Sequence, residues 1–544
     1  MKKLSLVFFV VFFIKISYSQ LKDFDIVKYG AKADGITNNV DAIQHAIDDA
    51  NKNGEGRVVV PAGKFLTGVI HLKSNVELFI DRDAVLLAST NRADYGPSEK
   101  ASAWIVAENA KNISITGKGT IDGQCDLLIN DIYKKLIAGQ LYDREWKQYN
   151  DWHQRRPSEN NRPRMIAFTN CDGVTIRNIH LQNGTSWIQA YKNCTNLIMD
   201  GVHVLSNTFL NNDGIDIVDC TNAKITNCDI NAADDGICLK SEDRNRRCEN
   251  IFVGNCKVRS SASAIKLGTA SRGGFKNIVI RNIEVYNTFR SAIAIESVDG
   301  GVLENIDVHD IHAVNTGNAI FIKLGHRNKD AVVSQLRNVL IKDVTVEVPK
   351  TKPDKGYSME GPELRVPSKK EDTTIQYPNG GAPWDRFGLD TTSELIPHNI
   401  FPSSISGIPN HPVENVVLQN ITIIYDGGGD TSGANFPLES FDKIPEGETS
   451  YPEFSMFGEV PVWGLYVRHV EGITLKNIKL VNKKKDYRTA VLVNDAKNVT
   501  LENFSVKGAT SLPVLFFNNV KSLQLQKMDI PGAKDKTIKI QSKE

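Results

Sequence analysis

The sequence lacks an excess of charge of either sign. Its 544 residues include 65 lysine and arginine residues and 64 aspartate and glutamate residues, so the formal net charge is +1. No global field attracts polyanions to such a chain, and nucleic-acid binding is excluded unless a basic patch is strongly localised. We therefore expect a partner of another class and no nucleic acid.

Apolar runs long enough to cross a bilayer are missing after the N-terminus. The N-terminus itself has the pattern of a secretory signal, with Lys2 and Lys3, an apolar core up to Ile14, and a small-x-small cleavage site at Ser17–Ser19. A membrane anchor is the alternative, but the run is too short to span a bilayer and Lys15 interrupts it. The pattern predicts a signal peptide over residues 1–19 and export to the periplasm or the extracellular space. We expect no membrane insertion and a monomer.

Zinc-ligand spacing is missing from the cysteines and histidines, and we expect neither a metal ion nor a cofactor. Eight cysteines in an exported chain are typical of a disulfide framework. Their placement argues against it, because five of them follow Asn or Asp at a similar place in a repeated phrase: Cys171, Cys194, Cys220, Cys228 and Cys256. Equivalent positions stack in neighbouring coils, where small buried thiols pack well. We predict mostly free, structural cysteines.

What the sequence does contain is a repeated phrase of Asn followed by alternating aliphatic residues, at a period of roughly 27 residues where it is uninterrupted. The phrase begins at Asn112, Asn196, Asn250, Asn277, Asn305, Asn338, Asn415 and Asn498. Alternation predicts short strands with one buried face, and such a repeat builds a solenoid. Leucine-rich repeats, the main rival, need a Leu-x-x-Leu-x-Leu signature that is absent. Asn tolerates the left-handed conformation of tight corners. We predict an all-β protein, a single-stranded right-handed parallel β-helix.

One face of this β-helix can be aligned from the sequence. The stacked segments begin at Gly214, Gly236, Ala264, Ala292 and Ala319. Their aliphatic residues point inward, and the alternate residues share one outward face. The aligned outward residues are Asp216, Cys238, Lys266, Ala294 and Phe321, and then Val218, Lys240, Gly268, Glu296 and Lys323.

A cap and three insertions complete the predicted organisation. Residues 20–82 form an N-terminal cap with a helix that Asn38 or Asn39 begins, because an open solenoid edge invites aggregation. The β-helix follows over 83–544. Insertions are expected at about 124–163, 350–412 and 426–462, either as walls of a binding cleft or as surface decoration. The first insertion is aromatic and charged, with Trp146, Trp152, His153, Arg155 and Arg156.

Three aspartates carry the chemistry that the alignment suggests. Asp213 precedes one aligned strand, Asp235 has the same position one coil later, and Asp234 lies beside it. Adjacent coils are about 4.8 Å apart, so the three carboxylates converge on one water or glycosidic oxygen. Such crowding raises at least one pKa, and glycoside hydrolysis needs one protonated and one ionised carboxyl group. Spacing alone leaves two alternatives open, namely turn-forming Asp-Gly pairs and a calcium site.

These motifs resemble those of glycoside hydrolase family 28, the polygalacturonases and their relatives. The Asn-x-Asp motif of the family reads Asn211-Asn212-Asp213 here, and its Asp pair reads Asp234-Asp235. Further matches are Arg162-Pro163-Arg164-Met165-Ile166, Asn183-Gly184-Thr185-Ser186-Trp187-Ile188 and, in the cap, Tyr29-Gly30-Ala31. The resemblance covers about residues 24–345 and implies a pectin-lyase-like β-helix that inverts anomeric configuration. It implies that Asp234 is the general acid and that Asp213 and Asp235 hold and deprotonate water.

The sequence departs from the family at two motifs. Ser260-Ser261-Ala262-Ser263-Ala264 stands where polygalacturonases carry Gly-His-Gly, and Ala294-Ile295-Glu296 stands where they carry Arg-Ile-Lys. The latter motif clamps a galacturonate carboxylate, which Glu296 would repel. Compensating cations, or else solvated surface charges, are Lys240, Lys266, Lys323, Arg244 and Arg327. Trp187, Trp146 and Trp152 are candidate sugar-stacking platforms, although Trp187 equally suits coil packing.

We therefore predict a divergent family member that hydrolyses a pectic polysaccharide or oligosaccharide containing galacturonate, with exo action favoured by the insertions. A β-helix polysaccharide lyase or epimerase is the first alternative, because these enzymes also need a base and a cation beside the uronate. The second alternative is a non-catalytic carbohydrate-binding solenoid, in which Asp234→Asn would change nothing.

Overall fold

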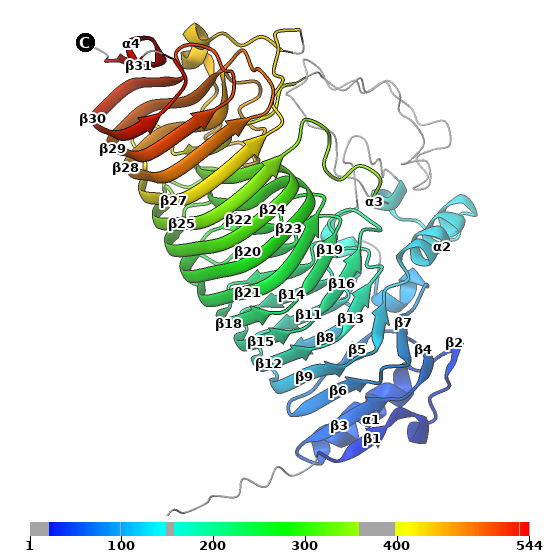
Figure 1. The fold of residues 1–544 in the computed structure, drawn as a ribbon. Helices are drawn as coiled ribbons and strands as arrows, with labels where there is room; N and C mark the ends of the chain where they lie inside the picture. The colour runs from blue at the N-terminus through cyan, green and yellow to red at the C-terminus, as the bar shows by residue number, and fades with distance from the viewer. Residues whose placement is uncertain are drawn as a thin grey trace, which may run out of the picture.

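The fold is a parallel β-helix, seen in a computed structural model that describes residues 21–97, 100–147, 157–357, 398–432, 434–532 and 534–542. Figure 1 shows the strands stacked as rungs from the N-terminal end in blue to the C-terminal end in red. The predicted signal peptide lies outside the described residues. No helix in these described ranges is long and apolar enough to cross a membrane.

Three rows of strands form the early coils, and every strand pairs in parallel with the equivalent strand of the next coil. The first row is β3 (Gly56–Val60), β6 (Val76–Ile80), β9 (Lys111–Gly117), β12 (Asp172–Arg177), β15 (Thr195–Asp200) and β18 (Thr221–Thr226). The second row is β4 (Gly63–Thr67), β7 (Ala84–Ala88), β10 (Thr120–Asp122), β13 (His180–Gln182), β16 (His203–Ser206) and β19 (Asp229–Ala232). The third row, here called the site row, is β5 (Ile70–His71), β8 (Ile105–Glu108), β11 (Ile166–Thr169), β14 (Gln189–Lys192), β17 (Ile215–Val218), β20 (Ile237–Ser241) and β22 (Ile265–Ser271).

In the later coils, long strands bend through more than one row. They are β21 (Cys248–Ser260), β23 (Gly274–Ser297), β24 (Val302–Leu324), β25 (Gln335–Val348), β27 (Val413–Tyr425), β28 (Val462–Asn482), β29 (Thr489–Lys507) and β30 (Leu515–Asp529). The site row is continued by the ends of β23 and β24, then by β26 (Ser403–Ser406), the starts of β28, β29 and β30, and finally β31 (Ile538–Gln541). Because β26 lies inside the predicted insertion at 350–412, the coil resumes before residue 412.

Asparagines close the corners between the strands. Asn222, Asn250 and Asn277 have φ of 56°, 58° and 55°, the left-handed conformation that Asn tolerates. Their side chains form a ladder, in which Asn250 Nδ2 donates to Asn222 Oδ1 at 3.3 Å and Asn277 Nδ2 donates to Asn250 Oδ1 at 3.1 Å. The prediction of Asn-closed corners is confirmed.

The interior holds the aliphatic residue of each alternating pair. Ile217, Leu267 and Ile295 are fully buried, and burying one such side chain contributes about 1.5–3 kcal/mol to the stability of the fold. All eight cysteines are free and buried, as predicted. Apolar burial repeated in every coil, rather than disulfides, stabilises this solenoid.

The N-terminal end is covered by β1 (Asp23–Asp25), a 3-10 turn, β2 (Asp34–Asn38) and α1 (Val40–Lys52). Helix α1 buries Ile43 and Ile47 against the first coil, as its periodicity predicts. Asn38 Oδ1 accepts a hydrogen bond of 3.1 Å from Val40 N at the helix start. The side chain of Asn39 instead accepts from Lys32 N at 2.7 Å.

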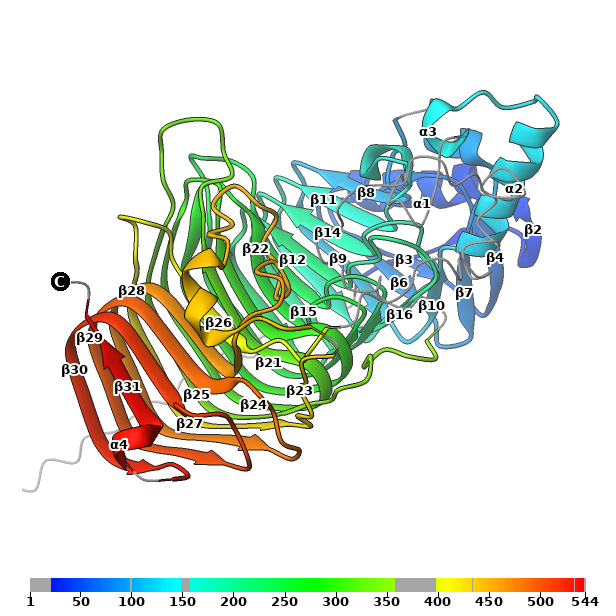
Figure 2. The ribbon, with the colours of Figure 1, turned by 90° about the horizontal axis from the view of Figure 1, so that it is seen from above.

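The first insertion projects from the early coils as α2 (Cys125–Ile137) and α3 (Arg144–Lys147) (Figures 1 and 2). Trp146 is 1% exposed and packs on Tyr133 and Phe209, with ring centroids 6.2 and 5.9 Å away. Trp146 is therefore core of the insertion, and the prediction that it stacks on a sugar is wrong. Trp152, His153, Arg155 and Arg156 lie outside the described residues.

Candidate active site

The three predicted aspartates meet at the start of two neighbouring strands of the site row. Asp213 precedes β17, Asp234 and Asp235 precede β20, and Gly214 N donates to Asp235 O at 2.9 Å across the coils. One carboxylate oxygen from each aspartate lies within 4.8 Å of the others. The prediction that these three carboxylates converge is therefore confirmed.

The glycines after these aspartates serve close approach between coils rather than a turn. Gly214 and Gly236 do not have a positive φ. A Cβ on Gly214 would lie 2.6 Å from Gly236 O, and one on Gly236 would lie 2.7 Å from Ala264 O. The Asp-Gly pairs thus let the coils stack tightly at the carboxylates.

Asp234 is the partly exposed member of the cluster, whereas Asp213 and Asp235 are each 3% exposed. Asn211 Nδ2 donates to Asp234 Oδ2 at 3.1 Å, and Asp235 N donates to its Oδ1 at 2.9 Å. The amide of Asn211 is oriented by Arg162, which donates to Asn211 Oδ1 at 2.7 Å. Arg162 therefore orients Asn211, which in turn contacts Asp234, and the partly exposed Asp234 is the carboxyl group of the cluster that solvent can reach.

Two buried lysines neutralise the other carboxylates. Lys240 Nζ lies 2.9 Å from Asp213 Oδ2 and also contacts Asp216, while Lys266 Nζ lies 3.0 Å from Asp235 Oδ2. Both lysines are under 10% exposed, so each ammonium is shielded from water. These predicted cations hold the clustered carboxylates and are not open surface charges.

Burial and charge shift the two buried aspartates in opposite directions. Burial, strengthened by the neighbouring charge of Asp216, raises the pKa of Asp213 well above its usual range despite Lys240. Burial also acts to raise the pKa of Asp235, but the cations of Lys266, Lys240 and Arg290 outweigh it and lower that pKa. Environments that move the pKa values of two neighbouring carboxyl groups apart in this way are typical of acid/base sites.

The carboxylate cluster is also a set that a hard cation accepts in principle. The ammonium groups of Lys240 and Lys266 already occupy Asp213 and Asp235 and would repel such a cation. The donor set therefore fits proton transfer better than calcium, the alternative that spacing left open.

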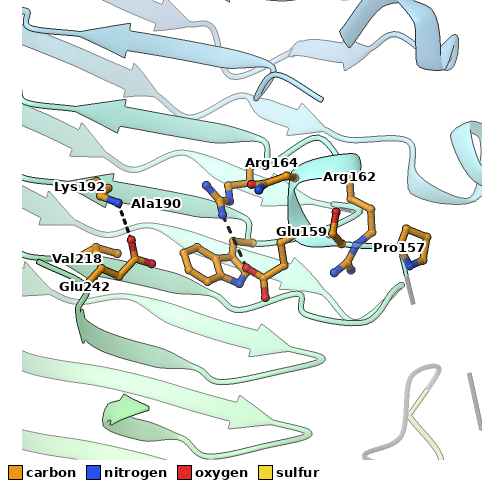
Figure 3. Close-up of a pocket in the computed structure, with 11 residues that line it drawn as sticks. Pro157, Glu159, Arg162, Arg164, Ala190, Lys192, Val218 and Glu242 are labelled. Atoms are coloured by element: carbon orange, nitrogen blue, oxygen red, sulfur yellow. Dashed lines mark hydrogen bonds and ion pairs between the residues drawn. The ribbon is translucent and has the colours of Figure 1, made fainter. Parts of the chain in front are cut away.

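A cavity of about 680 Å³ opens next to Arg162 and Trp187, and none of the three aspartates is among its lining residues (Figure 3). It is lined by Pro157, Ser158, Glu159, Asn160, Arg162, Arg164, Trp187, Ala190, Lys192, Val218 and Glu242. Two of its three cations are paired with carboxylates, since Lys192 Nζ lies 2.5 Å from Glu242 and Arg164 Nη2 lies 3.7 Å from Glu159. The third, Arg162, donates to Asn211 Oδ1 at 2.7 Å, so the lining carries an excess of one positive charge.

Trp187 joins this cavity to the carboxylates. Its ring lies under the cations of Arg164 and Lys240, at 4.4 and 4.2 Å from the ring centroid, and the residue is 7% exposed. Most of Trp187 is covered, as coil packing requires, while the residue also lines the cavity, so stacking on a sugar stays a prediction.

Three predicted cations are engaged elsewhere. Lys323 is 0% exposed, because the third insertion covers it and accepts its ammonium at Glu446 O, 3.0 Å away. Arg244 pairs with Asp330 at 2.6 Å. Arg327 donates two hydrogen bonds of 2.9 and 2.8 Å to Asp299. Burial contradicts the prediction that Lys323 binds substrate. The side chain of Arg244 is 40% exposed, so its contact with substrate stays a prediction. The aligned Lys240 and Gly268 do not pair either, because the register shifts between Leu239 and Ser241.

Arg290 and Tyr451 belong to the site but were missed in the sequence. Arg290 N donates to Ala262 O, two coils beyond Asp234, and its positive charge lowers the pKa of Asp235. Counting back from the aligned Ala292 would have placed Arg290 in the stack of Asp234. Tyr451 comes from the third insertion, and Lys266 Nζ donates to its hydroxyl at 3.2 Å. No repeat pattern predicts that contact.

Glu296 is 2% exposed beside this cluster, and its Oε2 accepts a hydrogen bond of 3.1 Å from Thr269. Burial, opposed by Lys266, raises the pKa of Glu296 to about 7. The folded protein thus binds more protons than the unfolded chain between the ordinary value and about pH 7. The contribution of Glu296 is fully present at low pH and is lost as the pH rises through this window.

We expect Glu296→Gln to stabilise the protein relative to wild type at pH 8 more than at pH 5, by on the order of 3 kcal/mol. Urea unfolding midpoints at the two pH values measure this difference. Glu284→Gln, an exposed position on the same strand β23, is the control and should show no such pH dependence. Equal effects of Glu296→Gln at both pH values would contradict the assigned burial cost.

A parallel β-helix that gathers three carboxylates and two buried lysines on one face has the groups of an acid/base site. The model of the glycosyl hydrolases family 28 matches residues 51–355, and the chain belongs to this family. The family that the motifs resemble is thereby confirmed.

Two curated relatives are similar to this chain. A probable polygalacturonase of Vitis vinifera is 30% identical over 319 residues, which cover 55% of this chain and 56% of the relative. An exo-poly-alpha-D-galacturonosidase of Dickeya chrysanthemi is 26% identical and aligns over 48% of this chain and 50% of its own length. The chain thus spans about half the length of the curated relatives it matches.

The solved structure of a hyperthermoactive exopolygalacturonase from Thermotoga maritima has a TM-score of 0.53 and 21% sequence identity to this chain. The similarity covers 74% of this chain and 87% of that one. At this identity it shows the fold alone, which is the right-handed parallel β-helix predicted from the repeat.

Proposed function

We propose that this protein hydrolyses a glycosidic bond in a pectic polysaccharide or oligosaccharide that contains galacturonate. The observation that carries the proposal is the approach of Asp213, Asp234 and Asp235 to within 4.8 Å of one another. Membership of the family and the names of the two relatives support the reaction and the substrate class.

In the proposed reaction, Asp234 donates its proton to the glycosidic oxygen as the bond to the anomeric carbon breaks. Asp213 and Asp235 hold a water whose oxygen attacks that carbon, and one of them accepts the proton that the water loses. The lowered pKa of Asp235 keeps it ionised, and the raised pKa of Asp213 makes it the stronger base once it is ionised. The products are two saturated sugars, one of which gains the hydroxyl from water.

The stereochemical outcome is open to a direct test. The resemblance to the family implies inversion, yet the carboxylates are closer than the roughly 6.5–9.5 Å usual for inverting enzymes. We expect inversion, as the family implies, because three closely spaced carboxylates can still hold one small water molecule between them. A time course of trigalacturonate hydrolysis by proton NMR should show the β-anomer of the new reducing end first, from an α-linked substrate.

The same spectra separate the competing functions. A vinylic proton signal from the new non-reducing end would show that the enzyme is a lyase and not a hydrolase. Unchanged spectra for every pectic oligosaccharide tried would reject the proposed activity. Early α-anomer would instead reject inversion while leaving hydrolysis intact.

Exo action and export are part of the proposal. The first insertion contributes the 157–164 side of the cavity, and a wall at one end of a groove favours cleavage from a chain end. The N-terminal charge and apolar pattern support export to the periplasm or the extracellular space, where pectic polymers are encountered.

A further inference from the structure

Arg290, near the end of β23, carries a guanidinium that makes no hydrogen bond to any residue the structure describes. Its Nε is buried without a partner, and its nearest carboxylate oxygen is Glu453 Oε2, 3.6 Å from Nη2. The side chain is 16% exposed. A largely buried donor without an acceptor costs free energy, which a bound anion would repay by accepting those hydrogen bonds.

Arg290 faces the catalytic cluster. Its main chain pairs with Ala262, which pairs in turn with the coil of Asp234, so about two coil spacings, roughly 10 Å, separate the two backbones. The charges of Asp234 and Asp235 both act on the Arg290 guanidinium. This is the distance range that one sugar ring next to the cleaved bond would occupy.

Tyr451 supplies a second polar group at the same place. Its ring is 51% exposed, and its hydroxyl accepts a hydrogen bond of 3.2 Å from Lys266 Nζ, which leaves the hydroxyl proton available to a ligand. The segment is anchored by Phe454, which packs on Phe289 and Phe401 with ring centroids 6.2 and 5.6 Å away. Tyr451 is therefore held beside Lys266, close enough for its hydroxyl to act on the Arg290 guanidinium.

Four other cations around the site have a carboxylate partner within hydrogen-bonding distance. Lys240 is held by Asp213 and Asp216, and Lys266 by Asp235. Arg327 is held by Asp299. On the cavity side, Lys192 pairs with Glu242. Arg290 differs from these four, because its ion-pair partner Glu453 lies beyond hydrogen-bonding distance at 3.6 Å and its Nε has no partner.

We propose that Arg290, together with the Tyr451 hydroxyl, binds the carboxylate of a sugar acid in the ring that adjoins Asp234 on the side of the later coils. The inference rests on the proposed function and adds to it the residues that select an acidic sugar there. Ala294 and Glu296 bring no cation to this face, and the planar fork of Arg290 matches a carboxylate in two parallel hydrogen bonds.

The test measures binding in the Asp234→Asn background, so that turnover does not consume the ligand. Isothermal titration calorimetry compares trigalacturonate with its fully methyl-esterified form. We expect the free acid to bind about ten- to hundredfold more tightly than the ester, and Arg290→Gln to remove this preference. Tyr451→Phe, a substitution at a half-exposed position that keeps the aromatic ring, should reduce the preference by about fivefold.

Arg327→Gln is the matched control, because that guanidinium lies 5.8 Å from the Tyr451 ring but is occupied by Asp299. It should leave the preference unchanged. Equal binding of acid and ester by the protein that retains Arg290, or no binding of either, would overturn the inference. The NMR time course with the unaltered protein tests hydrolysis separately, so failure of one proposal is distinguishable from failure of the other.

Discussion

Asp234→Asn should lower kcat by between about 10²- and 10⁴-fold while leaving substrate affinity nearly unchanged, because the amide cannot donate the proton that the departing oxygen needs. Asp234 is the cluster member that is partly exposed, and its two oxygens are fixed by Asn211 Nδ2 and Asp235 N. Initial rates on trigalacturonate, together with calorimetric binding constants, separate the loss of turnover from any loss of affinity.

The control for this substitution is Asp229→Asn, which changes an aspartate on strand β19 of the second row, outside the site row. It should keep wild-type kcat. If Asp234→Asn turned over substrate at the rate of this control, Asp234 would not be the general acid, and Asp213, whose pKa burial raises, would take its place.

Lys240→Met should destabilise the folded protein by about 3–5 kcal/mol, because it leaves the buried carboxylates of Asp213 and Asp216 without their shared cation. Asp216 is 0% exposed, and burial raises its pKa to about 6 even with the lysine present. Urea unfolding at pH 7 measures the loss. Adding Asp216→Asn to Lys240→Met should recover part of it, since one of the two stranded charges is gone.

Lys192→Met is the matched control for Lys240→Met. Lys192 occupies the equivalent position two coils earlier, because its backbone is paired with Val218 in the next coil and Val218 is paired with Lys240 in the coil after that. Its side chain is 44% exposed and pairs with Glu242 at 2.5 Å, so its removal should cost less than about 1 kcal/mol. Similar losses for the two lysines would contradict the role assigned to burial.

The coil repeat made the core of the site predictable. In a parallel β-helix, residues that are equivalent in neighbouring phrases stack directly, so aligning the strands at Gly214 and Gly236 was enough to bring Asp213 to Asp235. The same alignment correctly paired Cys238 with Lys266 and Lys266 with Ala294. It gave no sign that Lys240 reaches back across a coil to hold Asp213.

Side chains governed by the insertions could not be predicted in this way. The third insertion folds over the site row and buries Lys323 while it brings Tyr451 to Lys266, and neither contact follows from a repeat. Trp146 was misjudged for a related reason, because an aromatic residue in an insertion can form the insertion's own core. Only contacts between stacked coils are encoded by sequence spacing.

The most direct measurement of the central claim is mass spectrometry of pectic oligosaccharides incubated in water enriched in oxygen-18 with wild type and with Asp234→Asn. We expect wild type to give saturated products with one heavy oxygen at the new reducing end, and Asp234→Asn to give almost none. Products that are unsaturated, that lack the heavy oxygen, or that form equally fast with both proteins would contradict hydrolysis at the aspartate cluster.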